Sequence, residues 1–135
     1  MSYGSTVVLD QPFEDTVAAV RVALADQGFG VLTEIDVQAT MKAKLGADLA
    51  PYLILGACNP PLAHRVLQAE TSVGLLLPCN VVIRMTDEGT VVEAIDPMTM
   101  VSVSGNPALR PIVGEVADRL KAALAALTAL TAPTS

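Results

Sequence analysis

The sequence predicts a single α+β domain, in which a mainly antiparallel sheet of about five strands packs with helices on one of its faces. The chain has 135 residues, the size of one domain with a core of its own. Short apolar or β-branched runs alternate with stretches of helical periodicity. Asp87-Glu88-Gly89 lies between two such runs and is typical of a β-hairpin turn. The domain is expected over residues 1–130, and residues 131–135 are expected to fray.

Strands are expected at five short runs that Gly, Pro, Asp or Asn residues bound. The run at 52–57 is almost wholly apolar, which is typical of a central strand buried on both faces. The runs on either side of the hairpin turn should pair with each other. The expected strands cover residues 6–9, 31–35, 52–57, 80–86 and 90–95.

Helices are expected where apolar residues recur every three or four positions. Their starts are marked by Pro or by a capping Asp or Asn, and several of their ends are marked by Gly. The last helix is long and rich in Ala, with Leu residues along one side. The expected starts and ends are Pro12 and Gly28, Asp36 and Gly46, and Asn59 and Glu70, with Asn106 and Pro107 opening the final helix.

Composition argues against two classes of partner. The net charge is −6 and the eight Lys and Arg residues are scattered, whereas nucleic acid binding needs clustered basic residues. No apolar run approaches the roughly 18 to 20 residues of a membrane span. The N-terminus lacks the basic and apolar blocks of a secretory signal. We therefore expect a cytoplasmic protein that binds neither nucleic acid nor membrane.

The two cysteines of the chain, Cys58 and Cys79, are the candidate catalytic residues. If the strands at 52–57 and 80–86 are antiparallel neighbours, both cysteines lie at the same edge of the sheet. Cys58 also precedes the capping residue Asn59, and the positive end of a helix lowers the pKa of a nearby thiol. The alternative is that both are ordinary core residues, because free cysteine is among the most buried residue types.

Asn59, His64 and Asn80 are the candidate binding residues. The asparagines would cap or position the local backbone, while His64 is also explained by an exposed place on its helix. A soft metal ion at the two cysteines and His64 stays open, although three ligands are one fewer than a closed structural zinc site has. No other cofactor is expected, and the sequence holds no glycine-rich phosphate loop. It also holds no serine-nucleophile motif, which argues against a serine triad.

The segments that carry both cysteines resemble the DUF302 family, whose function is unknown. The similarity lies in YLILGACNP at 52–60 and GLLLPCNVV at 74–82, and it extends back to Met41 and forward to Pro97. The resemblance implies a β-α-β4-α arrangement like that of the TATA-binding protein (TBP-like), with a curved sheet. It also implies a homodimer. It implies no particular activity.

Three functions fit these observations. We favour a thiol site for redox chemistry or sulfur handling, with Cys58 as the reactive thiolate and Cys79 as its partner; a lowered pKa of Cys58 would support this. The first alternative is a non-enzymatic binding module, whose pocket holds a small apolar ligand or a soft metal. The second is a homodimeric interaction protein with an apolar surface. Whether the chain is an enzyme stays open.

Overall fold

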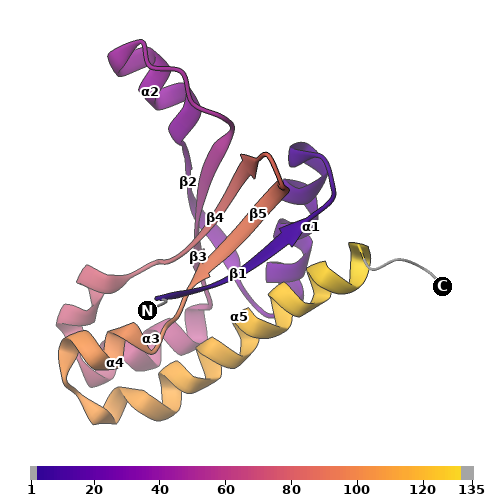
Figure 1. Ribbon diagram of the computed structural model, residues 1–135. Helices are drawn as coiled ribbons and strands as arrows, with labels where there is room; N and C mark the ends of the chain where they lie inside the picture. The colour runs from indigo at the N-terminus through magenta and orange to yellow at the C-terminus, as the bar shows by residue number, and fades with distance from the viewer. Residues whose placement is uncertain (1–2, 132–135) are drawn as a thin grey trace.

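Five antiparallel strands form one sheet in the computed structural model, which describes residues 3–131 (Figure 1). The strands are β1 (Gly4–Leu9), β2 (Gly30–Asp36), β3 (Tyr52–Cys58), β4 (Cys79–Thr86) and β5 (Gly89–Ile95). Their order across the sheet is β1-β5-β4-β3-β2, so β4 lies at the centre and β1 and β2 are the edges. The predicted α+β class is confirmed.

The helices begin close to the predicted capping residues. Asp36 Oδ1 accepts a hydrogen bond from the Ala39 backbone N–H at 2.9 Å, and Asn59 Oδ1 accepts one from Leu62 at 3.3 Å. The α-helices are α1 (Phe13–Asp26), α2 (Val37–Leu45), α3 (Pro60–Ala69), α4 (Thr99–Ser104) and α5 (Arg110–Thr131), and two 3₁₀ helices cover η1 (Thr71–Leu76) and η2 (Pro107–Leu109).

The last helix differs from its prediction at both ends. Asn106 does act as a cap, but the turn that it opens is the 3₁₀ helix η2, and α5 starts only after it. Thr131 is the final residue of α5, whereas the sequence placed it in a frayed tail. Residues 132–135 of that predicted tail lie outside the described residues. No helix in the described part of the chain is long and apolar enough to cross a membrane.

The core lies between one face of the sheet and the helices α1 and α5, which also pack against each other (Figure 1). Its centre is aliphatic, as a composition with 3% aromatic residues requires. Burying one such side chain fully contributes about 1.5–3 kcal/mol to folding. The most deeply buried core side chains include Leu9, Leu55, Ile83, Val92, Leu109, Val113 and Leu127.

No helix among the described residues covers the centre of the opposite face of the sheet, which corrects the prediction that the strand at 52–57 is buried on both faces (Figure 1). Leu53 and Leu55 of β3 are buried, but the alternating Tyr52 and Ile54 are only half-buried. The strand is therefore covered on one face, although its apolar sequence favoured burial on both. Arg84 and Glu93 form an ion pair of 2.9 Å between the neighbouring strands β4 and β5.

Residues 35–51, here called the arm, project from the rest of the molecule (Figure 1). They comprise the end of β2, helix α2 and the return to β3, and none of them is buried. The arm is held by local contacts: Gln38 Nε2 donates to the Leu49 carbonyl at 2.9 Å, and Lys42 pairs with Asp48 at 2.8 Å. Val37, Met41 and Leu45, which recur at helical spacing along α2, therefore face no core.

Gly56 is the point of closest approach between β3 and the segments on either side of it. A Cβ atom there would collide with the Thr33 side chain of β2 and would lie 2.7 Å from Pro78 Cγ. A glycine in the middle of a strand often marks such an approach, because no side chain stands between the two neighbours.

Replacing Gly56 by Ala should lower the free energy of unfolding by about 1–3 kcal/mol, the usual effect of forcing extra atoms into a packed site. Gly114→Ala is the matched control, because a Cβ on that α5 residue meets no atom within 4 Å. The control should raise stability by about 0.4–1 kcal/mol. Urea unfolding followed by far-UV circular dichroism measures both, and an unchanged stability of Gly56→Ala would contradict the packing.

Candidate functional site: a pocket beside two cysteines

The two cysteines lie at neighbouring strand ends, as the sequence predicted. In the antiparallel β3–β4 pair Ala57 is opposite Cys79, and Cys58 is the last residue of β3. Cys58 is half-buried, Cys79 is buried with 4% of its surface exposed, and both are free thiols. One edge of the sheet therefore carries two reduced sulfur atoms on adjacent strands.

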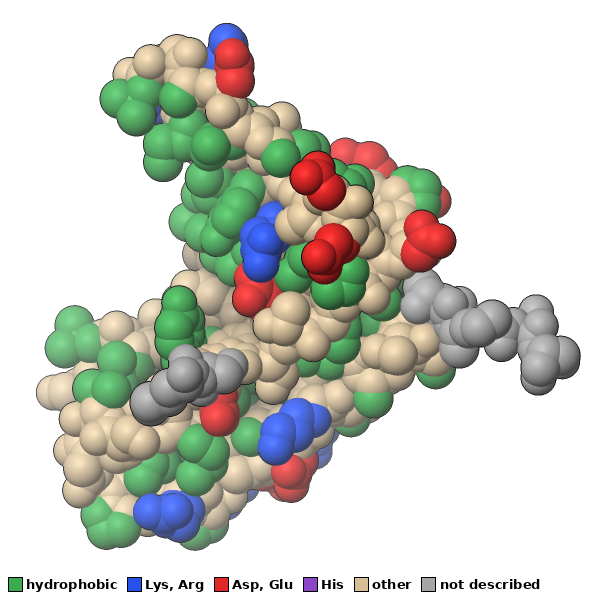
Figure 2. Space-filling view, viewed as in Figure 1, with side chains coloured by type: hydrophobic (Ala, Val, Ile, Leu, Met, Phe, Trp, Pro, Cys, Tyr) green, Lys and Arg blue, Asp and Glu red, His purple; other side chains and the backbone are tan. Residues whose placement is uncertain are grey.

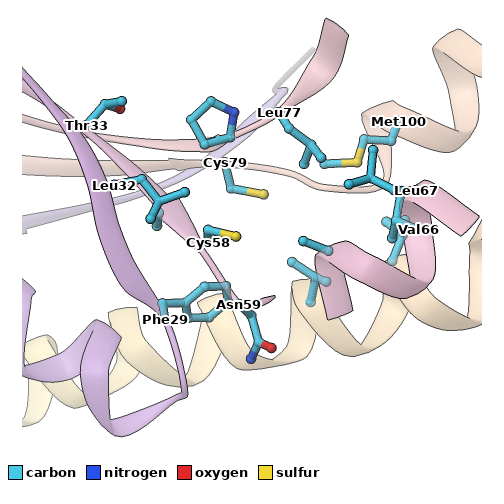
Figure 3. A pocket seen from close by; sticks show the side chains of 15 residues that line it. Phe29, Leu32, Thr33, Cys58, Asn59, Val66, Leu67, Leu77, Cys79 and Met100 are labelled. Carbon is cyan, nitrogen blue, oxygen red and sulfur yellow. The ribbon is translucent and has the colours of Figure 1, made fainter. Parts of the chain in front are cut away.

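Both cysteines line a cavity of about 290 Å³ (Figure 3). Its walls come from β2, the ends of β3 and β4, helix α3, the residues before β4, and helices α4 and α5. Apart from Thr33, Asn59 and the thiols, every lining residue is apolar. The apolar lining residues are Phe29, Leu32, Ala57, Ala63, Val66, Leu67, Leu77, Pro78, Met100, Val113 and Val116.

The sulfur atoms face the interior of this pocket. Figure 3 shows the Cys58 and Cys79 side chains turned to the same side, toward the wall that Leu67 and Met100 form. The Met100 thioether lies on that opposite wall and is 4% exposed as a residue. Three sulfur atoms thus line one cavity, and they come from β3, β4 and α4.

The surroundings of the thiols keep both of them protonated at neutral pH. Burial raises the pKa of Cys58 above its ordinary value. Burial, together with the smaller effect of the neighbouring Cys58 charge, raises the pKa of Cys79 to about 11. The start of α3 was expected to lower the pKa of Cys58, but the apolar wall has the larger effect because removal from water penalises a thiolate.

The three candidate binding residues lie in three different places. Asn59 is buried and lines the pocket, where its side chain caps α3 at Leu62. His64 is exposed on α3 and does not line the pocket, so the proposed ligand set of Cys58, Cys79 and His64 is not assembled. Asn80 is exposed and lies over the uncovered face of the sheet, in a separate shallow concavity beside Tyr52 and Glu93.

Much of the pocket wall was not expected from the sequence. Leu32 and Thr33 reach it from edge strand β2, and Val113 and Val116 reach it from α5. These segments are far from the cysteines in the chain, so only the strand order and the helix packing bring them together. Nothing in the sequence distinguished Met100, the wall residue from α4, from the other methionines of the chain.

The comparisons with known proteins agree on one family. Residues 5–127 match the family described as Domain of unknown function DUF302. The crystal structure of an uncharacterized conserved protein DUF302 from Bacillus stearothermophilus is similar, with a TM-score of 0.85 and 32% sequence identity. That similarity covers 92% of this chain and 97% of the other. No curated protein matches the chain.

The raised pKa values predict slow thiol labelling at neutral pH, because only the thiolate reacts. With Cys79→Ser isolating Cys58, the rate of alkylation by iodoacetamide should still be rising at pH 9. With Cys58→Ser isolating Cys79, labelling should be slower, and its pKa should lie below that of wild-type Cys79 because the neighbouring charge is gone.

Free cysteine in the same buffers is the control, with a pKa of about 8.5. A labelling rate for Cys58 that reaches its plateau below pH 8 would contradict the raised pKa. It would also restore the hypothesis of a reactive thiolate at this position.

Proposed function

The chain belongs to the DUF302 family, and from that premise we propose that it is a binding protein whose pocket takes a small, uncharged apolar molecule. The observation that carries this proposal is the cavity of about 290 Å³ with an almost wholly apolar wall. Ligand pockets in proteins are typically about 300–1,000 Å³ and mostly apolar, with a few polar groups that fix orientation. The cavity is at the small end of that range, so the ligand is a small one.

The polar groups of the wall are few and uncharged. Thr33 and the Asn59 amide stand at the wall beside the two thiols, and no Asp, Glu, Lys, Arg or His lines the cavity among the described residues. A charged organic ligand, which forms no bond to sulfur as a soft metal ion does, would lose its hydration there without gaining a partner of opposite charge, which costs far more than apolar burial returns. The organic ligand is therefore neutral.

The thiols support binding better than redox catalysis. A nucleophilic or redox cysteine works as the thiolate, and the pKa of each thiol is raised here. His64, the one histidine of the chain, lies outside the pocket, so no imidazole in it can take a proton from either cysteine. A protonated thiol behaves as a small hydrophobic group and completes an apolar wall.

The cavity opens to solvent between two exposed lining residues. Leu32 is 67% exposed and Leu67 is 36% exposed, although both line the pocket. These two side chains belong to β2 and α3, which form opposite sides of the opening (Figure 3). A ligand that enters between them would cover apolar surface that water now contacts, which adds to the affinity.

Filling the pocket should weaken the binding of an apolar probe. N-phenyl-1-naphthylamine, an uncharged dye that fluoresces in apolar surroundings, should bind the wild type with one site. Ala63→Leu places three extra carbons in the cavity and should weaken binding by at least about tenfold, equivalent to 1.4 kcal/mol. Ala69→Leu is the control, because Ala69 is an exposed residue of the same helix that does not line the pocket.

Fluorescence titration measures the dye affinity of all three proteins. Equal affinities for Ala63→Leu and wild type would contradict the proposed site. Equal losses in Ala63→Leu and Ala69→Leu would place the dye on the outer surface of α3.

We also propose that the arm associates with a second copy of the chain. A nine-residue helix is marginal in water without packing, yet no residue of α2 is buried. Ile35, Leu45 and Leu49 of the arm are 48%, 74% and 44% exposed. In Figure 2, apolar side chains follow the arm down to the hollow beneath it. An apolar surface of this kind marks an interaction site.

A second copy fits this surface better than a charged partner. The uncovered sheet face beside the arm holds apolar Ile54 and Val82, and its Arg84–Glu93 pair is internally neutral. Two chains that are both acidic can therefore meet at this face of the sheet without repulsion between like charges.

Charging the arm should dissociate the dimer. Leu45→Glu combined with Leu49→Glu should give a monomer by analytical ultracentrifugation, while the wild type sediments as a dimer. Leu75→Glu is the control: Leu75 is 89% exposed but lies in η1, away from the arm, and its replacement should leave the dimer intact. A monomeric wild type, or a dimer that survives the double substitution, would contradict the arm contact.

A further inference from the structure

We propose that the pocket also binds one soft monovalent metal ion, of the Cu(I) and Ag(I) class, between the sulfur atoms of Cys58 and Cys79 with the Met100 thioether as third ligand. This site shares the cavity of the proposed function but does not depend on an organic ligand. The inference rests on the sulfur atoms that the fold brings to one cavity from three separate elements.

The arrangement of the side chains favours a shared ion. Cys58 and Cys79 stand on adjacent antiparallel strands and point to the same side, and Met100 faces them from α4 (Figure 3). The two strands thus present neighbouring thiols to one cavity, and a soft ion placed between them would be bound from adjacent strands.

The ligand types select a soft ion. Thiolate and thioether sulfur favour Cu(I), whereas Cu(II) and Ni(II) favour nitrogen and oxygen ligands in a tetragonal arrangement. Structural zinc takes four ligands in almost every case. Among the described residues no His, Asp or Glu lines the cavity to complete such a set, and no cluster of three His, Cys, Asp or Glu residues occurs. A thioether is the one further ligand within the pocket that suits these thiols.

The charge of the complex is small. Both thiols are protonated before binding, so each loses one proton to solvent as its metal–sulfur bond forms, and no electron is transferred. Two thiolates and one monovalent cation leave a net charge of −1 at the site. Cys58 immediately precedes the N-cap of the ten-residue helix α3, whose positive end stabilises nearby negative charge. A divalent ion such as zinc would find three ligands where it usually takes four. An alkali ion would find sulfur atoms in place of the oxygen donors that it needs.

Titration with Cu(I) under anaerobic, reducing conditions tests the site, with bicinchoninate as the coloured competitor. The wild type should bind one ion per chain and release two protons per ion, measured in weakly buffered solution. Cys58→Ser and Cys79→Ser should each reduce the affinity by more than about 100-fold, beyond what loss of an outer-shell partner costs. Met100→Leu should weaken binding by about tenfold, the lower end of that same range.

His64→Gln is the matched control and should bind Cu(I) as the wild type does, because His64 is exposed and off the pocket. Circular dichroism shows which variants fold. Because Cys58 is only half-buried, Cys58→Ser should fold and can test the site even if Cys79→Ser unfolds. No binding by the wild type, or undiminished binding by the folded Cys58→Ser variant, would overturn the proposal. A loss in His64→Gln equal to that in Cys58→Ser would move the site to the surface of α3.

The experiments test the metal site and the apolar-ligand site separately. The wild type is titrated separately with N-phenyl-1-naphthylamine and with Cu(I), and Ala63→Leu should bind the dye more weakly. Dye binding without Cu(I) binding overturns the metal site alone, and Cu(I) binding without dye binding overturns the proposed function alone. When both bind, saturating Cu(I) should lower the dye affinity, since the two occupy one cavity.

Discussion

The antiparallel pairing of β3 with β4 is the constraint on which the pocket depends. Its register places Ala57 opposite Cys79, so the Cys79 side chain lies on the core side of the sheet beside the end of β3. A slip of one residue would turn Cys79 to the uncovered face and Asn80 toward the core, because neighbouring strand residues point to opposite faces. Gly56 of β3 also helps to hold the β3–β4 pair in place, because Thr33 and Pro78 pack closely over it.

The molecule divides into a packed body and an unpacked arm. In the body, α1 and α5 cover one face of the sheet, and the cavity lies where that packing gives way to the shorter helices α3 and α4. The arm is specified by local chemistry instead, through the Asp36 cap at the start of α2 and the left-handed Gly46 at the end of that helix. Binding of a ligand thus belongs to the body, and association with another copy belongs to the arm.

The sequence was most informative where structure is decided locally. Asp36 and Asn59 cap their helices, and the turn at Asp87-Glu88-Gly89 joins β4 to β5, as predicted. The neighbourhood of the cysteines also followed from the expected pairing of their strands. What the sequence could not supply was the environment of the thiols: the raised pKa of Cys58 depends on an apolar wall contributed by distant segments, including Leu32 and Val116.

The proposed function requires that the pocket be apolar and able to hold a guest. Methyl NMR of the protein under xenon pressure tests it most directly, since xenon enters empty apolar cavities and leaves polar, hydrated ones. The account predicts saturable chemical-shift changes confined to the lining methyl groups, among them those of Val66, Val113 and Val116. No saturable change at these methyl groups, or changes of equal size at exposed methyl groups such as those of Leu75, would contradict it.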